Sequence, residues 1–237
     1  MTRALIACLG IMMSGTAFAQ SWDEQIDGGG DAGDFPAPDG FQNTFGVGPL
    51  SNITGKINFL PESTQIRDDW VDAYCITVTD AEEFYATTDP HQDPSAGGFL
   101  DSRLWLFDLE GNLVMGNNDS PTNWFKSLLT DPGSYPGDVF DNPGSLVEGQ
   151  KYILAIAGFD NDPEDAAGQN LATLGISDAL WGPNPEAGSF DHWENGFFDG
   201  FGDYSIALNG ATYSVPAPGS IAALAGVGLM ATRRRRA

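Results

Sequence analysis

The chain has 237 residues, and its 33 acidic residues against 10 basic ones leave a formal net charge of −23 at pH 7. All 33 acids lie between Asp23 and Asp203 with only five basic residues, so this part carries a formal balance of −28. Such a surface repels nucleic acid and anionic lipid, and we expect no nucleic-acid partner. It also suits divalent cations, whose preferred ligands are carboxylate and carbonyl oxygens.

The first residues have the features of a secretory signal peptide. Arg3 precedes an apolar stretch from Ala4 to Met13, and Ala17-Phe18-Ala19 fits the small-x-small pattern before a cleavage site. We therefore predict a signal peptide over residues 1–19, removed after Ala19 by signal peptidase. Cys8 leaves with it, so no intramolecular disulfide can form, and Cys75 is expected to be a small buried side chain in a strand.

Residues 20–48 are rich in Gly, Asp and Pro, which predicts an acidic, extended leader that is at best partly ordered. Farther along the chain, "ITGKINF", "DAYCITVTD" and "GDYSIALNG" alternate apolar and polar side chains, the pattern of half-buried strands. "KYILAIAGF" is apolar on both faces, which is typical of a central strand, and "RLWLFD" and "LVMG" flank the turn "LEGN" as in a hairpin. No stretch has a sustained helical period. The pattern predicts one all-β domain, a sandwich or barrel, over residues 49–213.

Two long irregular stretches, 121–149 and 162–200, interrupt the predicted strands, and loops of that length are often functional. They contain Trp124, Trp181 and Trp193, whose rings could stack on sugars if exposed or fill small cores under loops if buried. Acidic turns follow two apolar strands, and they predict a calcium site formed by converging loops. Its candidate ligands are Asp119, Asp160, Asp162 and Asp165, for which turn formation by Asp and Asn side chains is the simpler explanation.

Patterns for catalysis are weak. Ser-His-Asp chemistry needs an activated serine near a histidine, and neither His91 nor His192 has a recognisable nucleophile motif beside it. Zinc needs three or four His or Cys ligands, and the body offers only these two histidines and Cys75. With 33 acids some carboxylates will lie close together in any fold, so a pair carries no argument for glycoside hydrolysis. We predict no enzyme activity.

The chain ends in "VPAPGSIAALAGVGLMATRRRRA". The segment from Ala217 to Thr232 is apolar or small, and it is shorter than the roughly 20 residues of a membrane-spanning helix. The arginines that follow could compensate by snorkelling and would stay cytoplasmic, which predicts a stop in the inner membrane. The proline-rich stretch before the segment is extended and accessible to a processing enzyme. An ordinary C-terminal membrane anchor is the alternative. The residues concerned are Val215, Pro216, Ala217 and Pro218 for processing, and Arg233, Arg234, Arg235 and Arg236 for the membrane stop.

This tail resembles a PEP-CTERM sorting signal, which consists of a Val-Pro-x-Pro motif, a short apolar helix and a terminal arginine cluster. It departs from the family at Ala217, where Glu is usual. The resemblance covers residues 214–237. It implies cleavage by an exosortase-type enzyme, transient contact with the inner membrane, and delivery to the cell surface or extracellular matrix.

The body is similar to the bacterial pre-peptidase C-terminal domains. The similarity lies in the strand of Asp72, Tyr74, Ile76 and Val78, the hairpin of residues 104–111, the loop 117–119, and the strand of Tyr152, Leu154 and Ile156. It implies an antiparallel β-sandwich of jelly-roll type.

These features together predict an exported, structural or adhesive surface protein that could contact exopolysaccharide. Two other classes stay open: a carbohydrate-binding module, which could depend on calcium, and an uncharacterised secreted hydrolase.

Overall fold

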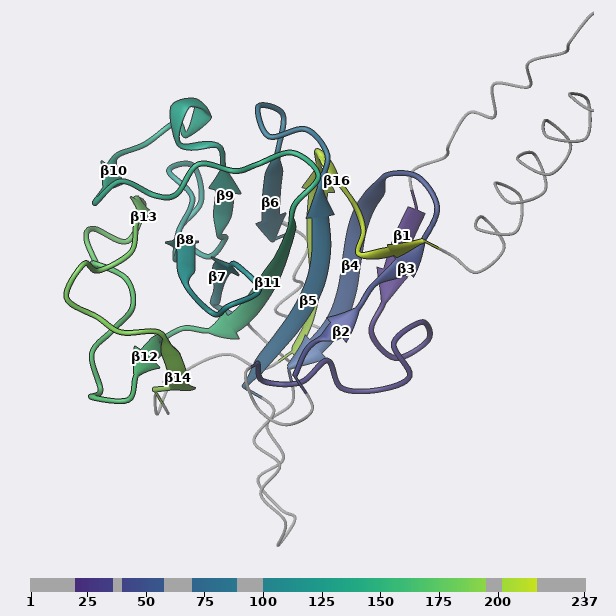
Figure 1. Ribbon diagram of the computed structural model, residues 1–237, viewed down its shortest axis with the longest axis horizontal. Helices are drawn as coiled ribbons and strands as arrows, with labels where there is room; N and C mark the ends of the chain where they lie inside the picture. The colour runs from purple at the N-terminus through teal and green to yellow at the C-terminus, as the bar shows by residue number, and fades with distance from the viewer. Residues whose placement is uncertain (1–19, 36–39, 58–69, 89–99, 195–201, 217–237) are drawn as a thin grey trace, which may run out of the picture.

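The computed structural model in Figure 1 describes residues 20–35, 40–57, 70–88, 100–194 and 202–216. These residues form seventeen strands and one short 3₁₀ turn, η2 (Pro132–Ser134), with no α-helix among them, so the prediction of an all-β fold is confirmed. This part of the chain holds no helix long and apolar enough to cross a membrane. The predicted signal peptide and the tail from Ala217 onward lie outside the described residues.

Two sheets make up most of the body. The five-stranded sheet has the order β1 (Gln20–Asp23), β4 (Leu50–Ile57), β15 (Gly202–Asn209), β6 (Tyr85–Thr88), β9 (Leu128–Thr130). The larger sheet has the order β10 (Val139–Phe140), β13 (Leu180–Trp181), β8 (Leu113–Asn117), β7 (Ser102–Phe107), β11 (Lys151–Gly158), β5 (Val71–Val78), β16 (Ala211–Tyr213), and β2 (Gln42–Asn43) pairs with β5. Two small pairs are β12 (Pro163–Asp165) with β14 (Phe190–Trp193) and β17 (Val215–Pro216) with β3 (Phe45–Gly46).

The sheets are mixed, although an antiparallel sandwich was expected. Four pairs are parallel: β1–β4, β2–β5, β10–β13 and β17–β3. Three of these involve short strands from residues 20–48, which the sequence pattern did not identify as strands. The long central pairs are antiparallel, including the predicted hairpin of β7 and β8.

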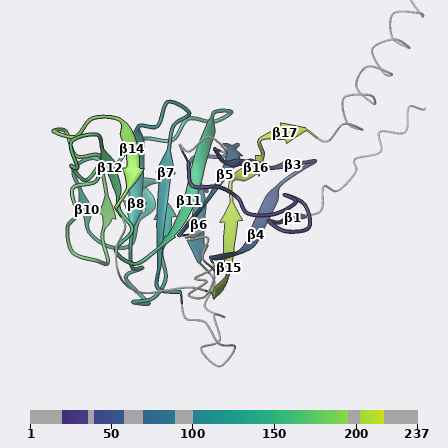
Figure 2. The same ribbon diagram turned by 90° about the horizontal axis from the view of Figure 1, so that it is seen from below.

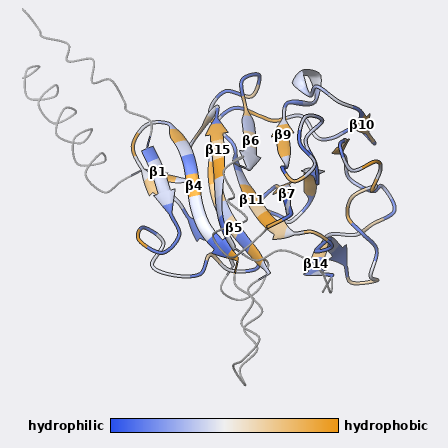
Figure 3. Ribbon diagram, turned by 180° about the vertical axis from the view of Figure 1, so that it is seen from behind, coloured by the Kyte–Doolittle hydropathy of each residue, from blue (hydrophilic) through white to orange (hydrophobic). Residues whose placement is uncertain are grey.

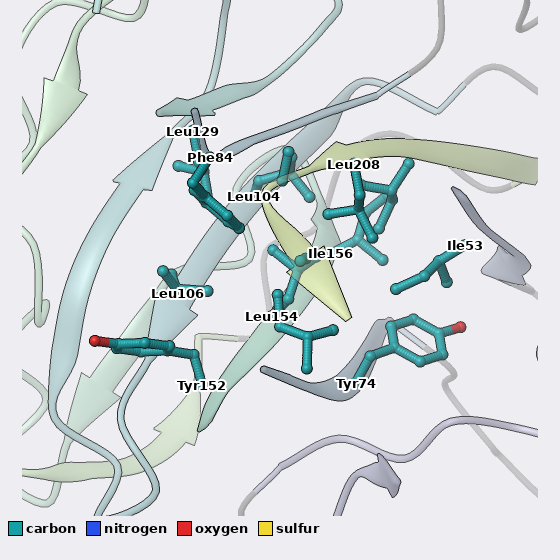
Figure 4. Packing of buried hydrophobic residues seen from close by; sticks show 14 of the residues in the cluster. Ile53, Tyr74, Phe84, Leu104, Leu106, Leu129, Tyr152, Leu154, Ile156 and Leu208 are labelled. Atoms are coloured by element: carbon teal, nitrogen blue, oxygen red, sulfur yellow. The ribbon is translucent and has the colours of Figure 1, made fainter. Parts of the chain in front are cut away.

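The main core lies between the two large sheets (Figure 4). Side chains alternate across a strand, so every second residue points into this layer. Tyr74 and Ile76 of β5 meet Ile206 and Leu208 of β15 there, in agreement with the predicted alternation. Figure 3 shows hydrophobic residues along β11 and β15, which lie inside the two sheets.

The outer face of the eight-stranded sheet carries a second core. Strands β5, β7 and β11 are apolar on both faces, so their remaining side chains also need cover. That cover comes from residues 162–194 of the long irregular stretch and from Phe35 of the predicted leader. The second cluster includes Val71, Ala73, Trp105, Phe107, Ile153, Ala155, Leu171, Trp181, Phe190 and Trp193.

The predicted leader takes part in the fold. Trp22 of β1 is fully buried in the main core, and its indole N–H donates to Gln42 Oε1 at 2.9 Å. This strand gains its backbone partners from β4, about thirty residues away. Composition alone did not indicate that pairing, because the segment has few aliphatic residues.

Both ends of the described chain lie at one edge of the body (Figure 2). Strand β1 is an edge strand of the five-stranded sheet, and β16 is an edge strand of the larger one. The Tyr213 hydroxyl donates to the Ser21 carbonyl at 3.3 Å across this edge. Buried Thr44 donates to the Cys75 carbonyl at 2.7 Å and accepts from the Ser214 N–H at 3.0 Å, so the last strands are joined to β5.

We predict that Trp22→Ala lowers the free energy of unfolding by about 3–5 kcal/mol, because it leaves a large cavity in the main core. Urea denaturation followed by tyrosine and tryptophan fluorescence measures the loss. Ile26→Ala in the same segment is the control, since Ile26 is exposed and its loss should change stability by less than about 0.5 kcal/mol. Equal, small effects of both substitutions would contradict a structural role for residues 20–35.

Candidate functional site

The two acidic loops predicted to bind calcium come together in the structure. Strand β7 lies between β8 and β11 and is antiparallel to both, so the start of β7 adjoins the ends of the other two strands. The loop after β8 and the loop after β11 therefore meet beside the first residues of β7. Arg103, the second residue of β7, lies between them and is nearly completely buried.

The Arg103 guanidinium occupies the centre of this junction. Its Nε donates to Asn118 Oδ1 at 3.1 Å, and Nη1 forms an ion pair with the buried carboxylate of Asp162. Its Nη2 lies 3.9 Å from Asp160 Oδ1. The guanidinium also lies over the ring of Phe159, 4.6 Å from the centroid, which adds a cation–π contact. A buried carboxylate needs a positive partner, and here that partner is an arginine.

Backbone geometry turns the second loop toward Arg103. Asp160 has φ of 68°, in the left-handed region that aspartate tolerates better than most residues. We define Arg103, Asn118, Asp160 and Asp162 as the Arg103 cluster. It brings together two of the four predicted calcium ligands.

The other two predicted ligands have different surroundings. Asp165 accepts hydrogen bonds from the backbone N–H groups of Gly188, Ala167 and Gln169 at 2.7, 2.8 and 3.0 Å, and these bonds lower the pKa of its carboxyl. This is the turn-forming role that the sequence offered as the simpler explanation. Asp119 is buried and accepts from Asn118 Nδ2 at 3.1 Å, and burial raises the pKa of its carboxyl.

A second set of carboxylates lies close together, at residues that the sequence did not indicate as a site. Among the described residues, Glu24, Asp31 and Asp72 are the one group of three whose carboxylate oxygens all lie within 4.8 Å of one another. We call these residues the acidic triad. Two come from the predicted leader and the third from β5, so only the folded chain brings them together. The signal available in the sequence was Asp72, an acid inside an otherwise apolar strand.

The acidic triad is held by hydrogen bonds. The Tyr204 hydroxyl donates to Asp72 Oδ2 at 2.7 Å and is itself hydrogen bonded to the Tyr74 hydroxyl. Glu24 Oε2 accepts from the Lys56 backbone N–H at 2.8 Å. Burial raises the pKa of Glu24, and burial together with the nearby Asp31 raises the pKa of Asp34 to about 6. Folding therefore favours the protonated form of the Glu24 and Asp34 carboxyl groups relative to the unfolded state.

The three tryptophans proposed for sugar binding differ in exposure. Trp181 and Trp193 are buried in the second core, where the Trp193 indole donates to the Phe35 carbonyl at 2.9 Å. Their rings fill the core under the loops, which leaves no open face for a ligand. Trp124 is 77 % exposed, in the loop between β8 and β9, and the exposed Phe125 follows it.

Part of the predicted processing motif belongs to the fold. Val215 and Pro216 form β17, and the Val215 N–H donates to the Thr44 carbonyl at 3.0 Å. Ala19, Ala217, Pro218 and the arginines at 233–236 lie outside the described residues. Cys75 is a buried free thiol whose pKa is raised by burial, as expected for a packing residue.

Comparisons with protein-family models, with curated proteins and with solved structures found no match to this chain.

We predict that Arg103→Met lowers the free energy of unfolding by about 3–5 kcal/mol, because it leaves the Asp162 carboxylate buried without its cation. Lys56→Met is the control, since the Lys56–Asp203 ion pair is exposed at 3.7 Å and such pairs contribute about 0–1 kcal/mol. Chemical denaturation of both variants measures the difference. If Arg103→Met cost no more than the control, the Arg103 cluster would not join the two loops.

We predict that the protein becomes more stable as the pH falls from about 7.5 to about 5. The raised pKa values of Glu24, Asp34 and Asp119 mean that the folded state binds these protons more tightly than the unfolded state. The ionised carboxylates therefore destabilise the folded state fully above its pKa, which is about 6 for Asp34. This destabilisation decreases as the pH falls toward 3.8, the pKa of the unfolded state. The contribution of Asp165, whose pKa is lowered, is lost only below 3.8.

Thermal unfolding followed by circular dichroism tests this dependence. The midpoint should rise by about 2–5 °C over this range. Asp34→Asn should raise the midpoint at about pH 7.5 and reduce the change with pH. A midpoint that falls on acidification to about pH 5 would contradict the assignment.

Proposed function

We propose that the protein is an exported cell-surface or matrix protein with a structural and adhesive role, whose body is a sandwich of jelly-roll type. In this proposal the C-terminal segment holds the chain transiently in the inner membrane until an exosortase-type enzyme cleaves near Val215–Pro218. One observation carries the adhesive role: the exposed aromatic loop lies at the edge of the body opposite to the chain ends.

The strand order supports that placement. Strands β1 and β9 are the two opposite edges of the five-stranded sheet, and β16 lies at the far end of the larger sheet from β10, β13 and β8. The chain enters at β1 and leaves after β16 and β17, whereas Trp124 lies between β8 and β9. A body held through its C-terminal end would therefore present Trp124 away from the point of attachment.

The chemistry of this loop suits a neutral polysaccharide. The aromatic pair Trp124–Phe125 offers apolar faces, and Thr122 and Asn123 beside it carry hydrogen-bonding side chains. Aromatic rings pack against apolar surfaces while polar neighbours bind hydroxyl groups. The acidic body disfavours anionic partners. We name matrix exopolysaccharide as the partner class, and no catalytic group is part of this proposal.

Intact-mass analysis of the protein from its own cells tests the proposal, with inner-membrane, surface and secreted fractions compared. We expect a species that begins after Ala19, ends between Val215 and Pro218, and is found outside the inner membrane. A chain that keeps its full tail in the inner membrane would overturn the sorting proposal and leave an ordinary anchor.

Two variants separate adhesion from sorting in the same fractions. Trp124→Ala should be processed normally yet be washed from the matrix fraction several-fold more easily than the unchanged protein. Leu109→Ala is the matched control, because Leu109 is an exposed hydrophobic residue in the β7–β8 turn. Equal retention of both variants would remove the role of Trp124.

A further inference from the structure

Two uncharged segments of this acidic chain meet where the chain leaves the body. They are residues 40–55 and residues 204–232, in a chain that carries 33 acids. Their described parts lie against each other: Val215 pairs with Phe45, Pro216 pairs with Gly46, and Pro49 bridges to Thr212. The two segments that meet where the chain leaves the body therefore carry no charge of their own.

This surface carries exposed apolar side chains. Phe45 is 48 % exposed, Val47 51 % and Val215 39 %. Val47 lies in the bend directly after β3, two residues from Phe45, and Val215 is the cross-strand partner of Phe45. We call these three residues the root patch. The Phe45 ring is held in place by the edge of Trp22, with ring centroids 4.8 Å apart.

The length of the tail leaves little distance between this patch and a membrane. The sixteen residues from Ala217 to Thr232 reach about 24 Å as a helix, which is less than the hydrocarbon core of about 30 Å. A segment that short has no spare residues at its ends, so its flanks are drawn to the bilayer surface. Pro216 ends β17, and one residue spans at most about 3.6 Å.

We propose that the root patch lies in the headgroup layer of the bilayer while the tail is anchored. This inference rests on the proposed function, because it requires the tail to enter the membrane. Phe45, Val47 and Val215 would be removed from water there, and the two segments that carry them have no acidic side chain for lipid phosphates to repel. The acidic remainder of the body and the Trp124 loop would then face away from the membrane.

Fluorescence quenching by labelled lipid tests the contact. The chain from Gln20 to Ala237, which retains only the buried and unlabelled Cys75, carries an environment-sensitive dye at Val47→Cys. It is reconstituted into phosphatidylcholine vesicles that contain a headgroup nitroxide lipid. The matched control carries the dye at Thr122→Cys, an exposed position in the loop at the opposite edge. We expect quenching several-fold stronger at position 47 than at position 122.

Flotation of the same vesicles separates the possible failures. Protein that floats with the vesicles but shows equal, weak quenching at both positions would overturn the root patch contact and leave the anchor intact. Protein that does not float would overturn the anchoring on which the inference rests. Emission at position 47 that shifts to the blue with protein density, without lipid quenching, would assign the patch to a second copy of the chain and overturn the lipid contact.

Discussion

The eight-stranded sheet is apolar on both faces, and the rest of the fold follows from the need to cover them. Its central strands β7, β11 and β5 are almost entirely buried, so neither face can be left in water. The five-stranded sheet covers one face, and the chain from about residue 159 to 194, with Phe35, covers the other. The long segments between strands are therefore a structural layer, and among their described residues the exposed aromatic rings are Trp124 and Phe125 of the β8–β9 loop.

Arg103 joins that outer layer to the sheet. A buried guanidinium requires compensating charge and hydrogen bonds, which restricts the two loops around it to one arrangement. Asn118 comes from the loop after β8 and Asp162 from the loop after β11, and the Trp181 ring lies 5.8 Å from the same guanidinium. The positive charge at this junction is that of the Arg103 guanidinium. The Arg103 cluster thus fixes the position of the outer loop layer over the second core.

The strands of the body could be predicted because their cause is local. Alternation in residues 71–78 and 202–209 and the turn at Gly111 are visible in the sequence, and the structure has β5, β15 and the β7–β8 hairpin there. The short strands β1, β2 and β3 could not be predicted, because their partners are distant and their composition resembles a linker. The proximity of the two acidic loops was also predictable, because each loop directly follows an apolar strand. The arginine at its centre, and the acidic triad of Glu24, Asp31 and Asp72, depend on long-range placement that no local pattern records.

The pairing of β4 with β15 has a consequence for the order of events in folding. Ile53 and Ile206 are paired neighbours although more than 150 residues separate them along the chain. Closing so long a loop is entropically costly and slow. Because synthesis proceeds from the N-terminus, β4 has no β15 partner until almost the whole chain has been made. Until then the five-stranded sheet cannot form, and one face of the larger sheet has no cover.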